Sequence, residues 1–348
     1  ICLVFLFRTL MLICCDGRVF WLLHLLCTSL LLCYNPESDK IIDMEEHISK
    51  FQDLEIAAEK LYRAGVTPLD DIEKLYNDMI DILDELIEAI KESNNAYKFL
   101  KAKGLDRIVT YGLKIQYPEL KTRVLNVLKV LFNVIPTTTD AVISKTIIDQ
   151  LMSVFEEDNL ALKTLSLEIL MLWLPENPTA QEYLMRIRGL QRFYNQTSLL
   201  DANAQRLLLE LLNKILKEHI NVRKEVQRTI ADGDKVKSYR KIGLIEHMSS
   251  PNVCNGLLNI FANIWSYNSQ DTNIMLTVFD LMRQVNQFCL KIFRGKSKAV
   301  QLFKALREYI RNLESNELFM FSGLNVTQME SELDGYMDKM KNPVKEEL

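Results

Sequence analysis

"LKTRVLNVLKVLFNVI", residues 120–135, recurs in altered form 42 residues later as "LKTLSLEILMLWLPEN" (162–177) and again as "AQRLLLELLNKILKEH" (204–219). The three stretches align without a gap, and apolar residues occupy the same positions in each. Because these residues recur at intervals of three and four, each stretch is expected to form a helix with one apolar face. The corresponding sets are Leu125, Leu167 and Leu209; Leu128, Leu170 and Leu212; and Leu131, Trp173 and Ile215.

A second pattern precedes each of these stretches. A period near 42 residues, with two or three helices per unit, is typical of armadillo and HEAT repeats. Each unit exposes an apolar face that only its neighbour can cover, so the units are expected to stack. The sequence therefore predicts an all-α fold, an armadillo/HEAT-like superhelical solenoid of about four repeats over residues 94–314. The preceding segments are "NNAYKFLKAKGLDRIV" around Gly104, "AVISKTIIDQLMSVF" around Ile147 and "PTAQEYLMRIRGLQRF" around Gly189.

The rest of the chain also indicates helices, and no alternating runs suggest strands. Residues 35–93 are expected to form an N-terminal helical segment, in which Leu75, Met79, Ile82, Leu86 and Ile90 make one stripe. This segment could be a regulatory arm or the first cap of the stack. A fourth, irregular unit is expected after an insertion, with a closing helix and a polar tail behind it. Its parts are the insertion at 226–237, helices at 253–267 and 272–293, the closing helix at 298–314 and the tail at 315–348.

The two ends of the sequence suggest a compartment. Residues 1–34 are strongly apolar and are expected to be a signal peptide, since the second apolar block, Val19 to Cys33, is shorter than the roughly 20 residues of a bilayer span. An uncleaved anchor is the alternative. The tetrapeptide Lys345, Glu346, Glu347 and Leu348 differs from K-D-E-L by one methylene group, which predicts a retrieval signal read by a retrieval receptor. Together they predict the lumen of the endoplasmic reticulum, without stable membrane insertion once the leader is removed.

Charge and cysteine usage narrow the class of protein. A net charge of −4 gives no reason to expect nucleic acid as a partner. Five of the seven cysteines fall in the expected leader, which leaves Cys254 and Cys289. We expect these two on consecutive antiparallel helices, offset by about one turn. Because helix axes lie about 8 to 10 Å apart and bridged Cα atoms need less than about 7 Å, two free thiols are expected, and a disulfide formed in an oxidising lumen is the alternative.

The sequence contains no pattern of an enzyme. Phosphate-binding, dinucleotide-binding and zinc-protease motifs are absent, and so is C-x-x-C. His47, His219 and His247 are far apart in the sequence, so we expect no catalytic residue, no metal and no cofactor. Two N-glycosylation sequons begin at Asn195 and Asn325 and are possible glycan sites if the chain enters the lumen.

Several stretches resemble one family. The heads "NNAYKFLKAKGL" and "PTAQEYLMRIRGL" match its N-A-x-x-x-L-x-x-x-G-L pattern, "LKTRVLNVL" and "LKTLSLEIL" match its third helices, and "KVKSYRKIGLIEHM" contains its Tyr-Arg followed by an apolar pair. From about Asp78 onward, the chain resembles the armadillo-type nucleotide exchange factors of heat-shock-seventy chaperones, and especially their lumenal members. It departs where the family often has two glycines, since Lys103 and Arg188 precede single glycines and the middle head has Thr146 in place of glycine.

The resemblance implies that the chain binds the nucleotide-binding domain of BiP, the lumenal chaperone, and promotes ADP release in support of protein translocation and folding. A lumenal adaptor or scaffold without exchange activity is one alternative, and a membrane-anchored helical protein is another.

Partner contacts are expected on the face of the repeated helices that points away from the leucine stripe. An ordinary solvated face is the alternative interpretation of this pattern. The middle unit stands out because "LSLEILMLWL" is apolar all round, so Met171 or Leu172 must be either covered or exposed. The predicted partner-binding residues, hereafter the six-residue face, are Asn126, Lys129, Glu168, Met171, Glu210 and Asn213, of which Glu168, Met171, Glu210 and Asn213 rank first.

Overall fold

A computed structural model of the 348-residue chain describes residues 43–65, 69–136, 145–186, 189–224, 230–248, 250–268, 271–312 and 326–341. The chain divides into two units, Ile1–Asp43 and Met44–Leu348, and the second contains every helix described below. The expected leader, the tetrapeptide at 345–348 and the sequon at Asn325 lie outside the described residues.

The described residues form helices and no strands, which confirms the all-α class. The helices are α3 (Met44–Ala64), α4 (Leu69–Ala89), α5 (Ser93–Lys101), the π-helix η2 (Leu105–Val109), α6 (Thr110–Gly112), α7 (Pro118–Val134), α9 (Lys145–Glu156), α10 (Leu160–Trp173), α11 (Pro178–Arg186), α12 (Gln191–Gln196), the 3-10 helix η3 (Thr197–Leu199), α13 (Ala202–Lys224), α14 (Ile230–Ile242), α15 (Leu244–Met248), α16 (Pro251–Asn268), α17 (Thr272–Phe293), α18 (Ser297–Asn312) and α20 (Val326–Lys341).

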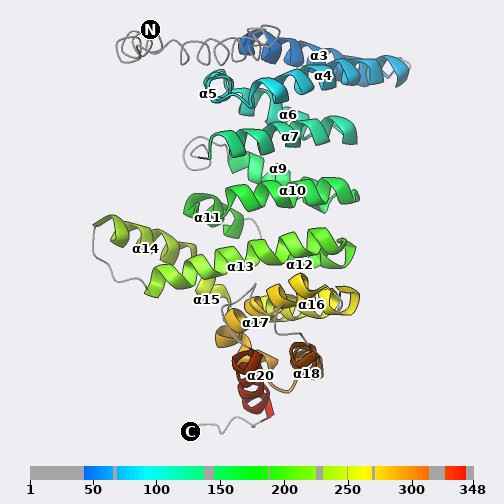
Figure 1. Ribbon diagram of the computed structural model, residues 1–348. Helices are drawn as coiled ribbons and strands as arrows, with labels where there is room; N and C mark the ends of the chain where they lie inside the picture. Colours follow the sequence, from blue (N-terminus) through cyan, green and yellow to red (C-terminus); the bar gives the residue numbers. More distant parts are fainter. Residues whose placement is uncertain are drawn as a thin grey trace, which may run out of the picture. The chain divides into compact units, whose positions relative to one another are not determined.

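The three repeated stretches form α7, α10 and α13, which lie side by side in that order (Figure 1). Helix α10 packs against α7 on one side and α13 on the other. The nine residues that correspond in the 42-residue register are all buried, with no more than 5% of any of them exposed. The register read from the sequence therefore marks the core between these helices.

The succession continues in both directions. Helix α4 packs on α7, and α3 packs on α4. Four members of the predicted stripe, Met79, Ile82, Leu86 and Ile90, are buried. Arg107 of η2 fixes α3 by donating hydrogen bonds to Gln52 Oε1 at 2.8 Å and Ser49 Oγ at 3.1 Å. Residues 44–64 and 69–89 thus extend the packing of α7 by two further helices.

At the other end, α17 packs on α13, and α20 packs on α17 and α18. Helix α20 lies in the segment that the sequence suggested was a polar tail. Its Met329, Leu333, Met337 and Met340 are buried, although polar residues dominate the stretch. The spacing of these four residues puts them on one helical face, and this outweighs the polar average composition.

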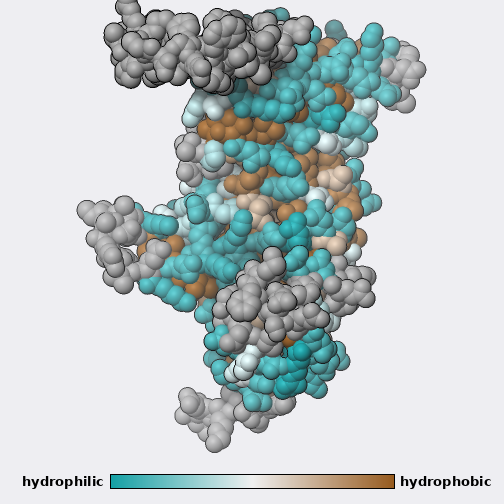
Figure 2. All heavy atoms as spheres, viewed as in Figure 1, coloured by the Kyte–Doolittle hydropathy of each residue, from teal (hydrophilic) through white to brown (hydrophobic). Residues whose placement is uncertain are grey.

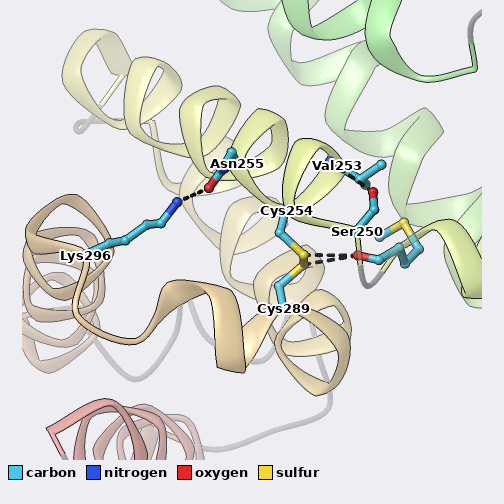
Figure 3. Close-up of a disulfide and its surroundings, with 7 residues drawn as sticks. Ser250, Val253, Cys254, Asn255, Cys289 and Lys296 are labelled. Carbon is cyan, nitrogen blue, oxygen red and sulfur yellow. Dashed lines mark hydrogen bonds between the residues drawn. A yellow bond between two sulfur atoms is a disulfide. The ribbon is translucent and has the colours of Figure 1, made fainter. Parts of the chain in front are cut away.

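The expectation that Cys254 and Cys289 do not pair is wrong. A disulfide joins them between α16 and α17, with their Cα atoms 5.4 Å apart (Figure 3). The error came from treating the distance between helix axes as the distance between Cα atoms. Each Cα lies about 2.3 Å from its axis, so two facing Cα atoms on axes 8 to 10 Å apart can come within about 3.4 to 5.4 Å.

Two heads of the repeat show why glycine sits where it does. In the third head Gly189 has φ +58°, a left-handed conformation. In the first head, Lys103 rather than a glycine adopts the left-handed conformation, also with φ +58°. The following Gly104 is in the ordinary helical region, and there a Cβ would lie 2.3 Å from the buried ring of Phe99. Gly104 is therefore required by close packing rather than by its backbone angle.

Candidate functional site

The six-residue face is distributed over α7, α10 and α13, two residues on each helix. All six side chains are half-buried, whereas the leucines on the opposite side of the same helices are fully buried. This difference follows from the helical period, because one side of each helix packs in the core and the other meets solvent. Each of the six residues is therefore less buried than the leucine series of its own helix.

Lys129 and Glu168 are in direct contact across α7 and α10. Lys129 Nζ donates a hydrogen bond to Glu168 Oε2 at 2.7 Å. An ion pair at this level of exposure contributes about 0 to 1 kcal/mol to stability. The pair therefore fixes the direction of two charged side chains more than it stabilises the fold.

Glu210 is paired within its own helix. Arg206 Nη1, one turn earlier in α13, donates to Glu210 Oε1 at 2.8 Å. Glu168 and Glu210 are thus both ion-paired and both half-buried.

Asn213 holds helices together. Its Nδ2 donates to Asp280 Oδ2 at 3.0 Å, and its Oδ1 accepts from Gln284 Nε2 at 2.5 Å, both on α17. Lys217 and Arg283 also pair with Asp280. Burial alone would raise the pKa of Asp280, but the hydrogen bonds from Lys217 and Asn213 outweigh it and lower that pKa. Because both ends of its amide are bonded, Asn213 serves the contact between α13 and α17.

Met171 and Leu172 of α10 differ in how far neighbouring residues cover them. Met171 is half-buried and Leu172 is 38% exposed, so Leu172 is the residue that leaves the core. Apolar surface emerges between hydrophilic residues around α7 and α10 (Figure 2). Leu172 follows Glu168 by one helical turn, so this exposed leucine neighbours the Lys129–Glu168 pair on the surface of α10.

A buried polar series escaped the sequence analysis. Lys121, Lys163 and Gln205 are 42 residues apart and almost completely buried in the first turn of α7, α10 and α13. Lys121 pairs with Glu157, and Lys163 Nζ donates to the Phe155 carbonyl at 3.1 Å. Burial lowers the pKa of Lys163 although nearby acidic side chains oppose this. The signal was available, because polar residues recur in the same register as the leucines.

Gln205 completes this series with a different chemistry. Its Nε2 donates to the carbonyl oxygens of Leu200 at 3.0 Å and Thr197 at 3.4 Å. Lys163 also donates to Gln196 Oε1 at 2.6 Å, so it joins the end of α9, before its own helix, to α12, after it. Such buried donors are stable only when they are satisfied in this way.

The tyrosine of the family-like Tyr-Arg pair is also structural. Tyr239 of α14 is buried, donates its hydroxyl hydrogen to Glu218 of α13 and lies edge-on to His219, with ring centroids 4.8 Å apart. His219 Nε2 is 2.7 Å from Gln181 Oε1 of α11. Burial, and then the charge of Arg223, lower the pKa of His219 to about 4. His219 is therefore a neutral member of a buried contact among α11, α13 and α14.

The first sequon begins on α12, and the described histidine near the N-terminus lies on α3. Asn195 is exposed on α12, but Thr197 of the same sequon is buried and donates to the Phe193 carbonyl at 3.1 Å. His47 lies 2.9 Å from Glu85, far from the other histidines in the sequence. Among the residues that the structure describes, no cluster of potential metal ligands is found. In that same part of the chain, no helix combines the length and apolar character needed to cross a bilayer.

Comparisons with known proteins do not assign a family. No protein-family model matches the chain. No curated protein gives a significant match either. Chains of known structure do match, among them the crystal structure of an engineered protein, with 10% identity over 87% of this chain and 100% of the other and a TM-score of 0.22.

Proposed function

We propose that residues 94–314 form an armadillo-like superhelical solenoid that α3 and α4 cap at its N-terminal end. The support is the order of packing, in which α4, α7, α10, α13 and α17 each contact the next. Two sets of residues repeat at 42-residue intervals inside this stack, the buried leucines and the buried polar series. Repeats that contact only their neighbours behave in this way.

We further propose that the protein is a nucleotide exchange factor that binds the nucleotide-binding domain of BiP and promotes ADP release. The observation that supports this best is the exposed Leu172 beside the oriented pair Lys129–Glu168, on a row of three helices. The repeat heads resemble those of armadillo-type exchange factors, which bind a folded ATPase domain. An oxidising lumen is proposed as the compartment because Cys254 and Cys289 form a disulfide.

In this proposal, exchange is mechanical. The stack holds one lobe of the ATPase and prefers the arrangement in which the nucleotide cleft is open, so ADP loses contacts and leaves. Linkage requires that nucleotide weaken the exchange factor's binding by the same factor. A hundredfold acceleration of release needs about 2.7 kcal/mol of differential stabilisation, which a few buried anchors can supply.

The test measures release of fluorescent ADP from BiP in the presence of the chain without residues 1–34. Faster release, together with dissociation of the complex by ATP, is the expected result. Unchanged release with stoichiometric binding would instead identify a lumenal adaptor or scaffold. Absence of binding to BiP would refute both.

A pair of substitutions tests the surface separately from the function. Glu168→Lys with Glu210→Lys should weaken binding to BiP and leave the helical content unchanged. Glu88→Lys with Glu246→Lys is the matched control, because these exposed glutamates are also ion-paired, to Lys91 and to Arg223. Equal binding by the two double variants would show that the six-residue face is not the contact surface.

A further inference from the structure

A pocket lies among α3, α4 and the segment from α6 to the start of α7. Its volume is about 750 Å³, within the range of pockets that hold small molecules or short peptide segments. None of the six-residue face lines it. Four tyrosines form much of its wall: Tyr62, Tyr76, Tyr111 and Tyr117. We call it the tyrosine pocket.

The tyrosines present ring surface to solvent. Tyr62 is 73% exposed and Tyr111 is 44% exposed, whereas Tyr76 and Tyr117 are half-buried and lie against each other with ring centroids 5.1 Å apart. The face of an aromatic ring carries partial negative charge, so several rings around one space favour a cation over a neutral or anionic group.

Carboxylates add full negative charge to the same space. Glu55, Glu59 and Glu73 line the pocket. Of these three glutamates, only Glu59 forms an ion pair with another described residue, Arg63, at 2.5 Å. Burial, and next the charge of Glu59, raise the pKa of Glu55 although Lys114 opposes this. Glu55 is therefore a partly desolvated carboxyl group without a direct ion-pair partner.

The pocket already shows how a cation would bind. Lys114 places its ammonium nitrogen 5.2 Å from the centre of the Tyr111 ring. An anionic ligand would meet three carboxylates here, and a purely apolar one would leave Glu55 and Glu73 without an ion-pair partner. The chemistry of the wall thus selects a positively charged group with an extended stem.

We propose that the tyrosine pocket binds a lysine or arginine side chain of an extended basic segment in a partner protein. The aromatic rings hold the alkyl stem and the charged head, and Glu55 and Glu73 complete the contact by pairing with the cation. This site shares no residue with the six-residue face and is independent of the exchange proposal.

The test uses fluorescence anisotropy of labelled peptides with the chain lacking residues 1–34 at physiological salt. The probe is a glycine-serine peptide with two lysines, compared with the same peptide carrying norleucine or glutamate instead. The lysine peptide should bind and the other two should not. A peptide with trimethyl-lysine should bind at least as well as lysine, because ring faces need charge but no hydrogen-bond donor.

Variants distinguish the pocket from the acidic surface in general. Tyr62→Leu and Glu73→Gln should each weaken binding by about two- to fivefold, the effect of one exposed cation–π contact or ion pair. Lys114→Gln should strengthen it by a similar factor, about two- to fivefold, because it removes the resident cation. This gain cannot arise from unfolding. Tyr97→Leu is the control, since Tyr97 is 56% exposed on α5 and does not line the pocket.

Three results would overturn the proposal. Equal binding of the norleucine and lysine peptides would show that the pocket does not select for positive charge. Unchanged binding of the lysine peptide by the Tyr62→Leu and Glu73→Gln variants would show that the peptide binds elsewhere. A dimer seen by sedimentation and lost in Tyr62→Leu would show that a second copy of the chain occupies the pocket.

Discussion

Reduction of the disulfide between Cys254 and Cys289 should loosen the C-terminal helices while it leaves the N-terminal ones folded. The bridge joins α16 to α17, and both cysteines are buried. Reduction breaks the bond between the two sulfur atoms and adds one hydrogen to each of them. It removes no atom from the core. It therefore isolates the link better than substitution does.

The expected size follows from the length of the closed loop. The two cysteines are 35 residues apart in sequence. Loop-closure entropy of the unfolded chain then amounts to about 3.8 kcal/mol at 25 °C. This is a large fraction of the roughly 5 to 15 kcal/mol that keeps a typical domain folded. Since stacked helices contact mainly their neighbours, the loss should concentrate in α16, α17, α18 and α20.

Hydrogen exchange followed by mass spectrometry measures this directly. With a reducing agent, protection of the slowest amides in α16 and α17 should fall by up to roughly 500-fold, which corresponds to the full 3.8 kcal/mol. Protection in α4 and α7 should stay within about twofold, because these helices do not contact the bridge. The double variant Cys254→Ala with Cys289→Ala serves as control and should not respond to the reducing agent. Equal protection of α16 and α17 in the oxidised and reduced protein would refute the reasoning.

Further predictions concern the buried polar contacts and the repeat heads. Because the folded pKa of His219, about 4, is below its usual 6.5, the unfolded chain takes up the proton first, and stability should fall by about 3 kcal/mol as the pH drops from 6.5 towards 4. Denaturation curves of His219→Gln should lack this component. Lys103→Gly should raise the free energy of unfolding by about 0.5 to 1 kcal/mol by relieving a left-handed lysine, and Gly104→Ala should lower it by about 1 to 3 kcal/mol. Asp280→Asn should lower the free energy of unfolding, measured in urea, by about 2 kcal/mol. The new amide group carries no negative charge, and its NH2 would face the donors of Asn213, Lys217 and Arg283.

The core could be predicted because its information is local and repeated. The 42-residue register of Leu125, Leu167 and Leu209 needs only the helical period and the requirement that each apolar face be covered. The same logic placed the six-residue face on the less buried part of each helix. It missed Lys121 and Lys163, since a lysine in an apolar register is ordinarily interpreted as solvent-facing, and burial becomes possible only when a carbonyl or carboxylate lies within reach.

The remaining features depend on how elements meet, which no local pattern encodes. Pairing of Cys254 with Cys289 requires that both face the same gap between α16 and α17 at the same height. The tyrosine pocket combines residues between Glu55 and Tyr117 from α3, α4 and the segment from α6 to the start of α7, so its composition follows only from their packing. The register of Asn213 predicts a side chain that faces solvent. In the structure, however, its amide nitrogen and oxygen both form hydrogen bonds to side chains of α17.

This difference changes how the proposed contact with BiP should be examined. A substitution of Asn213 would disturb α17 as well as any partner, so its effect on binding would be ambiguous. Glu168 and Glu210 are rim charges, and charge reversal there should chiefly slow association, with a strong dependence on salt. Leu172 can be buried by a partner and should act as an anchor, so Leu172→Ala should mainly speed dissociation.

Surface plasmon resonance separates these two effects. Fully burying a leucine side chain contributes about 1.5 to 3 kcal/mol. Because Leu172 is 38% exposed, a partner can cover only that part, which is worth about 0.6 to 1.1 kcal/mol, and Leu172→Ala should raise the dissociation rate by roughly 3- to 7-fold. Leu199→Ala is the matched control, because Leu199 is 57% exposed on η3 and lies outside the face. If both alanine variants dissociate at the same rate, Leu172 is not covered by the partner. The contact would then lie on another surface of the stack, whatever the result of the charge reversal.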